Sequence, residues 1–101
     1  MINVIASITI KEGRIPEFIE IFKANVPLVL KEKGCIGYLP TMDVDSGLPP
    51  QERDENVVTI IEQWETLADL KAHLTAPHML TYKKKVEDIV VGLSLKVLQA
   101  I

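Results

Sequence analysis

Apolar and polar residues alternate along residues 2–10, and this pattern constrains the fold more than any other feature of the chain. Val4, Ala6 and Ile8 fall on one side of an extended segment, and more polar residues fall on the other. Many of the side chains are β-branched, which favours a strand. Residues 57–64 alternate in the same way, although both of their sides are partly apolar. The pattern predicts two strands of a sheet.

The segment between these strands predicts a helix and then another strand. Pro16 suits the first turn of the helix, and Gly34 suits its end. Pro27 falls inside the helix, where its missing N–H group predicts a kink or break. The strand is expected from Cys35 to about Val44, on a sheet edge because it contains Pro40. The apolar positions of the helix are Phe18, Ile21, Phe22, Val26, Val29 and Leu30.

The second half of the chain predicts a loop, more helix and a last strand. The hydrophilic segment from Asp45 to Asn56 is expected to be plain surface, with a mobile lid as the less favoured interpretation. Thr66 and Asp69 form a capping-box-like start for a short helix. Pro77 restarts the helix, which we expect to continue to Gly92. The last strand is predicted from the alternation of Leu93, Leu95 and Val97.

The expected element order is β-α-β-β-α-(α)-β, a ferredoxin-like α+β plan with both helical layers on one face of an antiparallel sheet. A partly apolar sheet face without helices usually marks an interaction surface. Two copies are therefore expected to close on each other as a dimeric α+β barrel, a homodimer with polar groups lining a cavity. The residues expected on this second face are Asn3, Ile5, Ser7, Ile60, Glu62 and Trp64.

Length, charge and cysteine content narrow the classes of function. The 101 residues suit one domain spanning residues 1–101. The net charge is −3, and acidic residues follow the basic run at 83–85, so we expect a solvated helix face and no nucleic-acid partner. No stretch predicts a membrane span or a signal peptide, which favours a cytoplasmic protein. Cys35 stands alone and is expected to be a buried structural thiol.

Glu62 and Trp64 are the first candidates for a site. Glu62 lies in an otherwise apolar strand, where a charge is costly unless it is paired. Its carboxylate could bond a ligand or an opposing subunit, or point to the rim. Trp64 offers stacking and one N–H donor to a planar ligand, although simple packing is the alternative.

His73 and His78 are the other leading candidates. Histidine titrates near neutral pH and can act as an acid or a base, although an exposed histidine without a role is common. The two residues are five positions apart with Pro77 between them, so they do not have the facing spacing of a helical metal site. No metal is therefore expected. Motifs typical of hydrolases, nucleoside triphosphatases and nicotinamide-dependent enzymes are absent.

Taken together, four segments resemble the antibiotic biosynthesis monooxygenase family. The segments are INVIASITIKEGR, EFIEIFKANV, EKGCIGY and TIIEQWETLADLKAHLTAPHM. The most specific part is the E-x-W pair followed by A-H-x-x-x-x-H. The resemblance implies a dimeric α+β barrel and a quinol or phenolic substrate oxidised by molecular oxygen with no cofactor. Such chemistry requires a dry pocket and a proton acceptor near a phenolic oxygen.

The resemblance also implies roles for individual residues. His73 is the expected base, and Glu62 is expected to orient or tune it. Trp64 and Tyr38 would shape the pocket wall. Asn3 or Asn25 would hold a carbonyl oxygen, and His78 and Met79 would complete the substrate-binding residues.

The family's other branches leave alternatives open. One isomerises a phosphorylated autoinducer-2-type dicarbonyl sugar derivative and is similar around EFIEIFKANV and HLTAPH. Such a substrate would need a basic group, and Lys71 or Lys83 would serve. The haem-degrading branch is disfavoured because it has tryptophan where this chain has His73 and histidine where this chain has Lys83. A non-catalytic binding module is the third alternative. The loop at 45–56 and Pro27 depart from the family's compact pattern.

Overall fold

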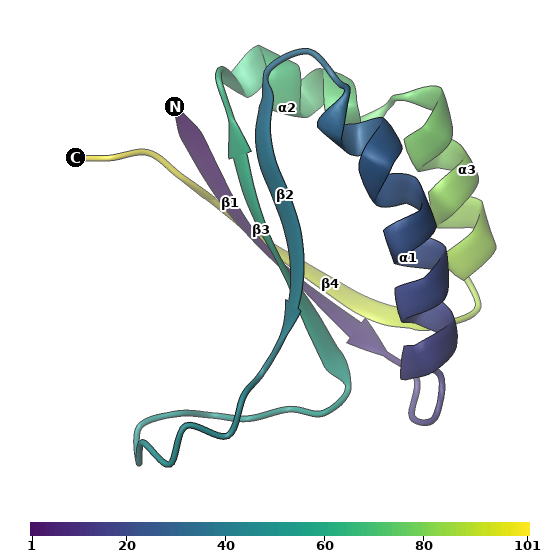
Figure 1. Cartoon of the computed structure of the whole chain (residues 1–101), viewed down its shortest axis with the longest axis vertical. Coiled ribbons are helices and arrows are strands. Elements are labelled where there is room, and N and C mark those ends of the chain that lie inside the picture. Colours follow the sequence, from purple (N-terminus) through teal and green to yellow (C-terminus); the bar gives the residue numbers. More distant parts are fainter.

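The computed structural model describes residues 1–101, and it confirms the expected ferredoxin-like α+β order (Figure 1). Four strands and three helices follow one another along the chain. The elements are β1 (Ile2–Ile10), α1 (Ile15–Leu30), β2 (Cys35–Met42), β3 (Val57–Trp64), α2 (Leu67–Leu74), α3 (Pro77–Val86) and β4 (Val90–Leu98).

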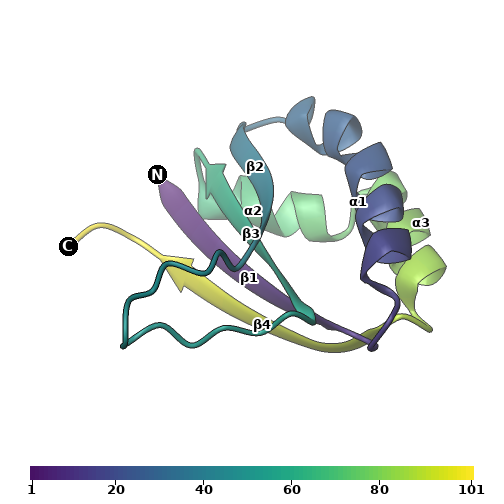
Figure 2. The same cartoon turned by 60° about the horizontal axis from the view of Figure 1, so that its bottom comes forward.

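The four strands form one antiparallel sheet in the order β2-β3-β1-β4. All three helices lie on one face of this sheet, and α1 and α3 run side by side (Figures 1 and 2). Val4, Ala6 and Ile8 face the helices and are buried, as the alternation predicted. Phe18 and Phe22 of α1 close the core from the other side. Pro40 lies in the edge strand β2, which confirms that prediction.

Ile60, Glu62 and Trp64 lie on the helix-covered face, so their predicted place on the opposite face is wrong. The register of β1 with β3 decides this, because Val4 pairs with Glu62 and Ala6 with Ile60. Directly paired residues of antiparallel strands point to the same side of a sheet. Both sides of β3 are partly apolar, so its alternation alone does not identify the buried side. The correction places these three residues in the space between sheet and helices.

Two predicted helix boundaries also need correction. Helix α1 continues through Pro27 to Leu30, so the predicted break is absent. Pro27 is exposed, and so is Lys23, whose carbonyl group loses its helical partner and can bond water instead. Helix α3 ends at Val86 rather than near Gly92. Residues 90–98 form β4 instead, and the pairing of β1 with β4 contains a bulge. Pairing with β1 therefore places Val90 in a strand, although its spacing from Val86 and Ile89 suits a helix.

The segment at 43–56 is an exposed loop that extends away from the sheet (Figure 1). Strand β2 therefore ends at Met42, two residues before the predicted limit near Val44. Cys35 is half-buried rather than buried. No helix in the structure combines the length and the apolar character needed to cross a membrane.

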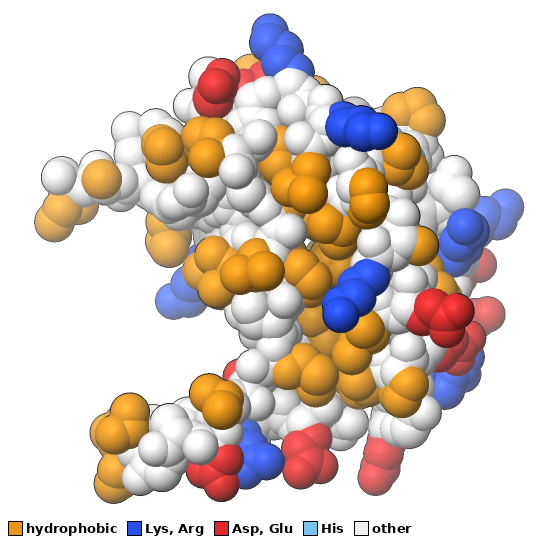
Figure 3. Space-filling model, in the orientation of Figure 1, with side chains coloured by type: hydrophobic (Ala, Val, Ile, Leu, Met, Phe, Trp, Pro, Cys, Tyr) orange, Lys and Arg blue, Asp and Glu red, His pale blue; other side chains and the backbone are white.

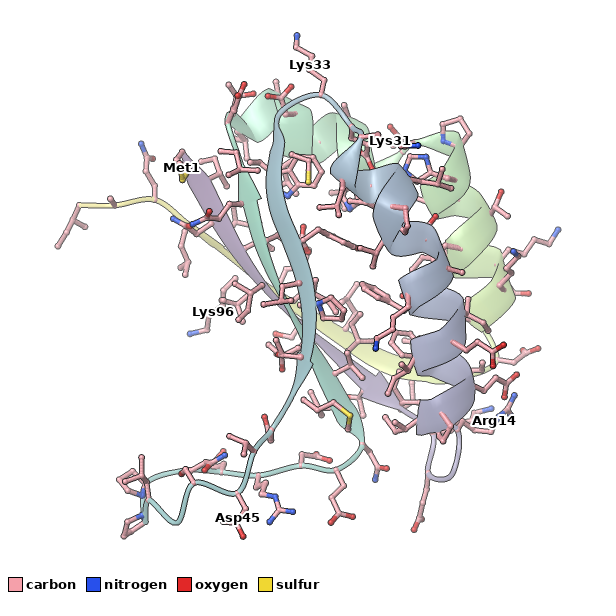
Figure 4. All side chains as sticks on the ribbon, viewed as in Figure 1. Met1, Arg14, Lys31, Lys33, Asp45 and Lys96 are labelled. Carbon is pink, nitrogen blue, oxygen red and sulfur yellow. The ribbon has the colours of Figure 1, made fainter.

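The sheet face without helices presents a row of side chains across three strands. Leu39 pairs with Ile61, which in turn pairs with Ile5. Leu39 and Ile61 are 57% and 44% exposed. Lys96 pairs with Ile5 and points away from the helices on this side of the molecule (Figure 4). Figure 3 shows that the molecule is hollowed between the loop and the C-terminal end, with hydrophobic side chains near the hollow. We call the sheet face without helices, centred on Leu39, Ile61 and Ile5, the open sheet face.

Candidate functional site

A cavity of about 300 Å³ lies between the sheet and the helices. Twelve of its sixteen lining residues are hydrophobic, so it offers a mostly dry environment. Leu93 and Leu95 of β4 line it but remain 62% and 46% exposed, which places the opening along this strand. Lys83 and Glu87 are exposed lining residues. The buried polar lining groups are those of Tyr38, Tyr82, Glu62 and His73.

Helix α2 holds His73 against the sheet. The side chain of Thr66 caps this helix by accepting a hydrogen bond of 3.1 Å from the backbone N–H of Asp69, as the capping pattern predicted. His73 lies in the last turn and is only 2% exposed. Its ring centroid is 4.7 Å from that of Trp64 and 5.4 Å from that of Tyr38. These contacts fix the orientation of the imidazole in the cavity wall.

Glu32 is the acidic partner of His73. Its carboxylate lies in the turn after α1, 2.8 Å from His73 Nδ1, and the two residues are 41 positions apart in the chain. A carboxylate can only accept hydrogen bonds, so His73 Nδ1 must carry the proton. The neutral imidazole then has its lone pair at Nε2. This arrangement leaves Nε2 available to take a proton from a molecule in the cavity.

His78 contacts the same carboxylate from α3. Its Nε2 is 2.8 Å from Glu32 Oε2, the oxygen that also lies 2.8 Å from His73 Nδ1. Burial lowers the pKa of His73, and the hydrogen bond and charge of Glu32 oppose this effect. His78 and Lys83 add smaller lowering effects. The balance favours the neutral, proton-accepting form of His73.

Glu62 bonds Trp64 rather than His73. Trp64 Nε1 donates a hydrogen bond of 3.0 Å to Glu62 Oε1. Trp64 is 0% exposed and Glu62 is 5% exposed. Burial raises the pKa of Glu62, the bond from Trp64 opposes this, and the charge of Glu32 adds to the rise. The prediction that Glu62 orients His73 is therefore not met in the structure. Glu32 makes that contact instead.

Aromatic rings form the rest of the cavity wall. Tyr38 stacks on Phe22 with the ring centroids 5.5 Å apart, and Tyr82 meets Phe22 edge-on at the same distance. Burial raises the pKa of both tyrosines, so their hydroxyl groups keep their protons. Figure 4 shows side chains filling the space between the sheet and α1. A flat ring would meet aromatic surfaces here with hydroxyl donors beside it.

The remaining predicted site residues are only partly brought together. Met79 lines the cavity and is buried. Asn25 donates a hydrogen bond of 3.3 Å to Met79 Sδ, but it lines a second cavity of about 210 Å³ between α1 and α3, as does His78. Asn3 lies on the sheet face without helices, where it accepts a hydrogen bond from Gln63. Asn3 therefore does not reach the main cavity.

Glu32 is the site residue that the sequence analysis missed. A local signal exists, because Glu32 follows the C-terminal end of a helix, where the helix dipole disfavours a negative charge. Once the fold buries such an acidic residue, it needs hydrogen-bond donors from other segments. The structure contains no group of three or more His, Cys, Asp or Glu side chains arranged to hold a metal ion.

Comparison with known proteins agrees with this fold. The family model described as "Antibiotic biosynthesis monooxygenase" matches residues 1–85. The chain belongs to this family. It is 39% identical to the "Probable quinol monooxygenase YgiN" of Escherichia coli (strain K12), and the match covers 98% of this chain and 97% of that protein. The protein of the same name from Shigella flexneri matches equally well.

Solved structures show the same fold. A putative antibiotic biosynthesis monooxygenase from Nitrosomonas europaea superposes with a TM-score of 0.85 at 20% identity, over 100% of this chain and 99% of that one. The protein PA3566 from Pseudomonas aeruginosa superposes with a TM-score of 0.82 at 24% identity, over 99% of this chain and 93% of that one.

Proposed function

We propose that this protein is a cofactor-independent monooxygenase that acts on a quinol or a related phenolic molecule. The observation that carries the proposal is the pairing of His73 with Glu32 in the wall of a mostly apolar cavity. The pairing supplies a base, and the mostly apolar lining limits the water around it. The probable quinol monooxygenases that are 39% identical over nearly the whole chain support the substrate class.

The first chemical step assigned to the protein is a proton transfer. Nε2 of His73 takes the proton of a phenolic hydroxyl group, and Glu32 stabilises the imidazolium that forms. The phenolate is richer in electrons than the phenol and can reduce molecular oxygen itself. For a quinol, oxygen and substrate give a hydroxyquinone and water, so one oxygen atom enters the ring. The ring supplies all four electrons, and no outside reductant is needed.

The other cavity residues position the substrate. Burial raises the pKa of Glu62, so this carboxyl group takes up a proton more readily than one in water and, when protonated, can donate a hydrogen bond to a substrate oxygen. Trp64 holds this group in place through its Nε1–H. Tyr38 and Met79 contact the ring, with the tyrosine hydroxyl as a second donor.

The functional unit in this proposal is a homodimer that forms through the open sheet face. Leu39, Ile61 and Ile5 form an apolar row across three strands. Burial of this row against a second copy would remove it from water, which stabilises a chain of this size. The helix-side cavity stays free in such a dimer because it lies on the other side of the sheet.

Oxygen uptake by the purified protein with reduced naphthoquinols, corrected for autoxidation, tests the proposal. We expect enzymatic uptake and the incorporation of one labelled oxygen atom per product from ¹⁸O₂. The variant His73→Asn keeps a donor for Glu32 but lacks the base, so it should lose turnover. Leu80→Ala, at an exposed position of α3, is the matched control and should keep it.

Three outcomes would overturn the proposal. Oxygen uptake no faster than autoxidation would exclude an oxygenase activity. Conversion of a phosphorylated dicarbonyl sugar by the same preparation would assign an isomerase instead. Saturable quinol binding without turnover would assign a binding module.

A further inference from the structure

We infer that His78 is a positioning residue that acts through Glu32 on His73, by donating a second hydrogen bond to the carboxylate oxygen that the two histidines share. The consequence is that Glu32 fixes which nitrogen of His73 is free, and His78 limits how strongly His73 holds a proton. The inference deepens the proposed function, because it rests on His73 as the base.

The shared oxygen is the central observation. Oε2 of Glu32 lies 2.8 Å from His73 Nδ1 and 2.8 Å from His78 Nε2, while Oε1 lies 3.1 Å from His73 Nδ1. A carboxylate has only acceptor sites, so both nitrogens must be donors. His78 is therefore the Nε2–H tautomer in this arrangement when neutral, and His73 is the Nδ1–H tautomer.

The burial of Glu32 explains why two donors are present. Its side chain is only 12% exposed, between His73 at 2% and His78 at 23%. A carboxylate removed from water is costly unless hydrogen bonds replace its hydration. The turn after α1, the end of α2 and the start of α3 each contribute one of the three side chains. The carboxylate of Glu32 therefore links α2 and α3 to the turn after α1.

Competition for this charge sets the direction of the effect. The hydrogen bond and the charge of Glu32 both raise the pKa of His73, whereas the positive charge of His78 lowers it. When two donors share an oxygen, each receives less of its acceptor strength than a single donor would receive. Loss of the His78 donor should therefore strengthen the bond from Glu32 to His73 and raise the proton affinity of His73.

The surroundings of the two histidines differ. His73 lines the main cavity, whereas His78 lines the second cavity between α1 and α3. A change at His78 therefore alters His73 without altering the wall that meets the substrate. Other titratable or charged groups near the cluster are Cys35 and Tyr38 on β2, Glu62 on β3, and Tyr82, Lys83 and Lys85 on α3.

Two variants separate a positioning role from simple packing. His78→Phe keeps a ring of similar size but removes the donor. His78→Gln keeps an amide N–H that can replace the Nε2–H and does not titrate. The measurement is the pKa of His73, which is obtained from a pH titration by ¹⁵N and ¹H NMR of the full chain without substrate. Because no turnover is involved, its result is independent of whether the oxygenase proposal holds.

We expect the pKa of His73 to rise by about half a unit or more in His78→Phe, which is within the range of neighbouring-charge effects. It should rise by less in His78→Gln, which keeps the donor but lacks the charge. Where turnover is measurable, the acid limb of kcat/KM should move to higher pH in His78→Phe and by less in His78→Gln, with KM little changed.

Two results would overturn the inference. The first is an unchanged pKa of His73 in a folded His78→Phe protein. The second requires no variant and applies even if His78→Phe does not fold: ¹⁵N shifts of the wild type that place the neutral proton of His73 on Nε2, or that of His78 on Nδ1.

Discussion

Trp64 donates its indole N–H to Glu62 across 3.0 Å, and the two residues are two positions apart on the helix-covered side of β3. The bond gives a buried carboxyl group one donor but does not cancel the cost of burying its charge, because the pKa of Glu62 is still raised. Glu62 therefore stabilises the fold more when it is protonated than when it is ionised.

The first prediction concerns the stability of Glu62→Gln at different pH values. A carboxyl group whose pKa is higher in the folded than in the unfolded state contributes most below its unfolded pKa. That contribution is lost as the pH rises through the folded pKa. Glu62→Gln cannot ionise, so its free energy of unfolding should decline less than that of the wild type as the pH rises from about 4. Urea denaturation at several pH values measures this, and parallel curves would contradict it.

The second prediction concerns Glu32→Gln. The substitution removes the charge that opposes the effect of burial on His73, so the pKa of His73 should fall further below its ordinary value. The amide also no longer enforces the Nδ1–H tautomer. We expect a loss of about 10²- to 10⁴-fold in kcat. The acid limb of kcat/KM should move to lower pH, opposite to the shift expected for His78→Phe. A shift to higher pH would contradict the assigned role of Glu32.

Local patterns in the sequence predicted most of the fold. The alternation in β1, the capping residue Thr66 and the proline at the start of α3 act over a few residues, so their consequences can be predicted without tertiary information. The side of β3 that is buried could not be predicted in this way. It depends on the register with β1, and both sides of β3 are apolar enough to be core.

The candidate site was predicted only in part for a related reason. His73 and Tyr38 were identified by residue type, and both line the cavity. The pairing of His73 with Glu32 joins residues 41 positions apart, and no periodic pattern links them. Asn3 was assigned to the substrate because a cavity was expected on the sheet face without helices, but the main cavity lies on the helix-covered face.

The third prediction compares two glycines with similar backbone conformations. Gly34 has φ +79° and Gly13 has φ +81°, a region that disfavours L-residues. A Cβ at Gly34 would collide with the side chain of Asp69, whereas a Cβ at Gly13 would meet open space. Asp69 also accepts a hydrogen bond of 2.9 Å from the hydroxyl of Thr66. A collision there would therefore disturb the start of α2, the helix that carries His73.

Gly13→Ala should cost about 1 kcal/mol through backbone strain alone. Gly34→Ala should cost about 2–4 kcal/mol because the steric conflict adds to the strain. Chemical denaturation of both variants measures the difference. Equal losses would mean that Asp69 moves aside freely.

The fourth prediction tests the proposed dimer at the centre of the open sheet face. Ile61 lies between Leu39 and Ile5 in the row, and Lys96 on β4 already places one positive charge on this face. Ile61→Lys would bring a further unpaired charge from each copy into the interface, where desolvation is costly. The wild type should sediment as a dimer at micromolar concentration, and Ile61→Lys should dissociate at least about tenfold more readily.

Leu80→Lys, on the exposed side of α3, introduces the same charge at a residue that is 55% exposed and should remain dimeric. Circular dichroism checks that each variant is folded. A monomeric wild type would contradict the proposed dimer. Equal dissociation of both lysine variants would show that the interface does not lie on the open sheet face.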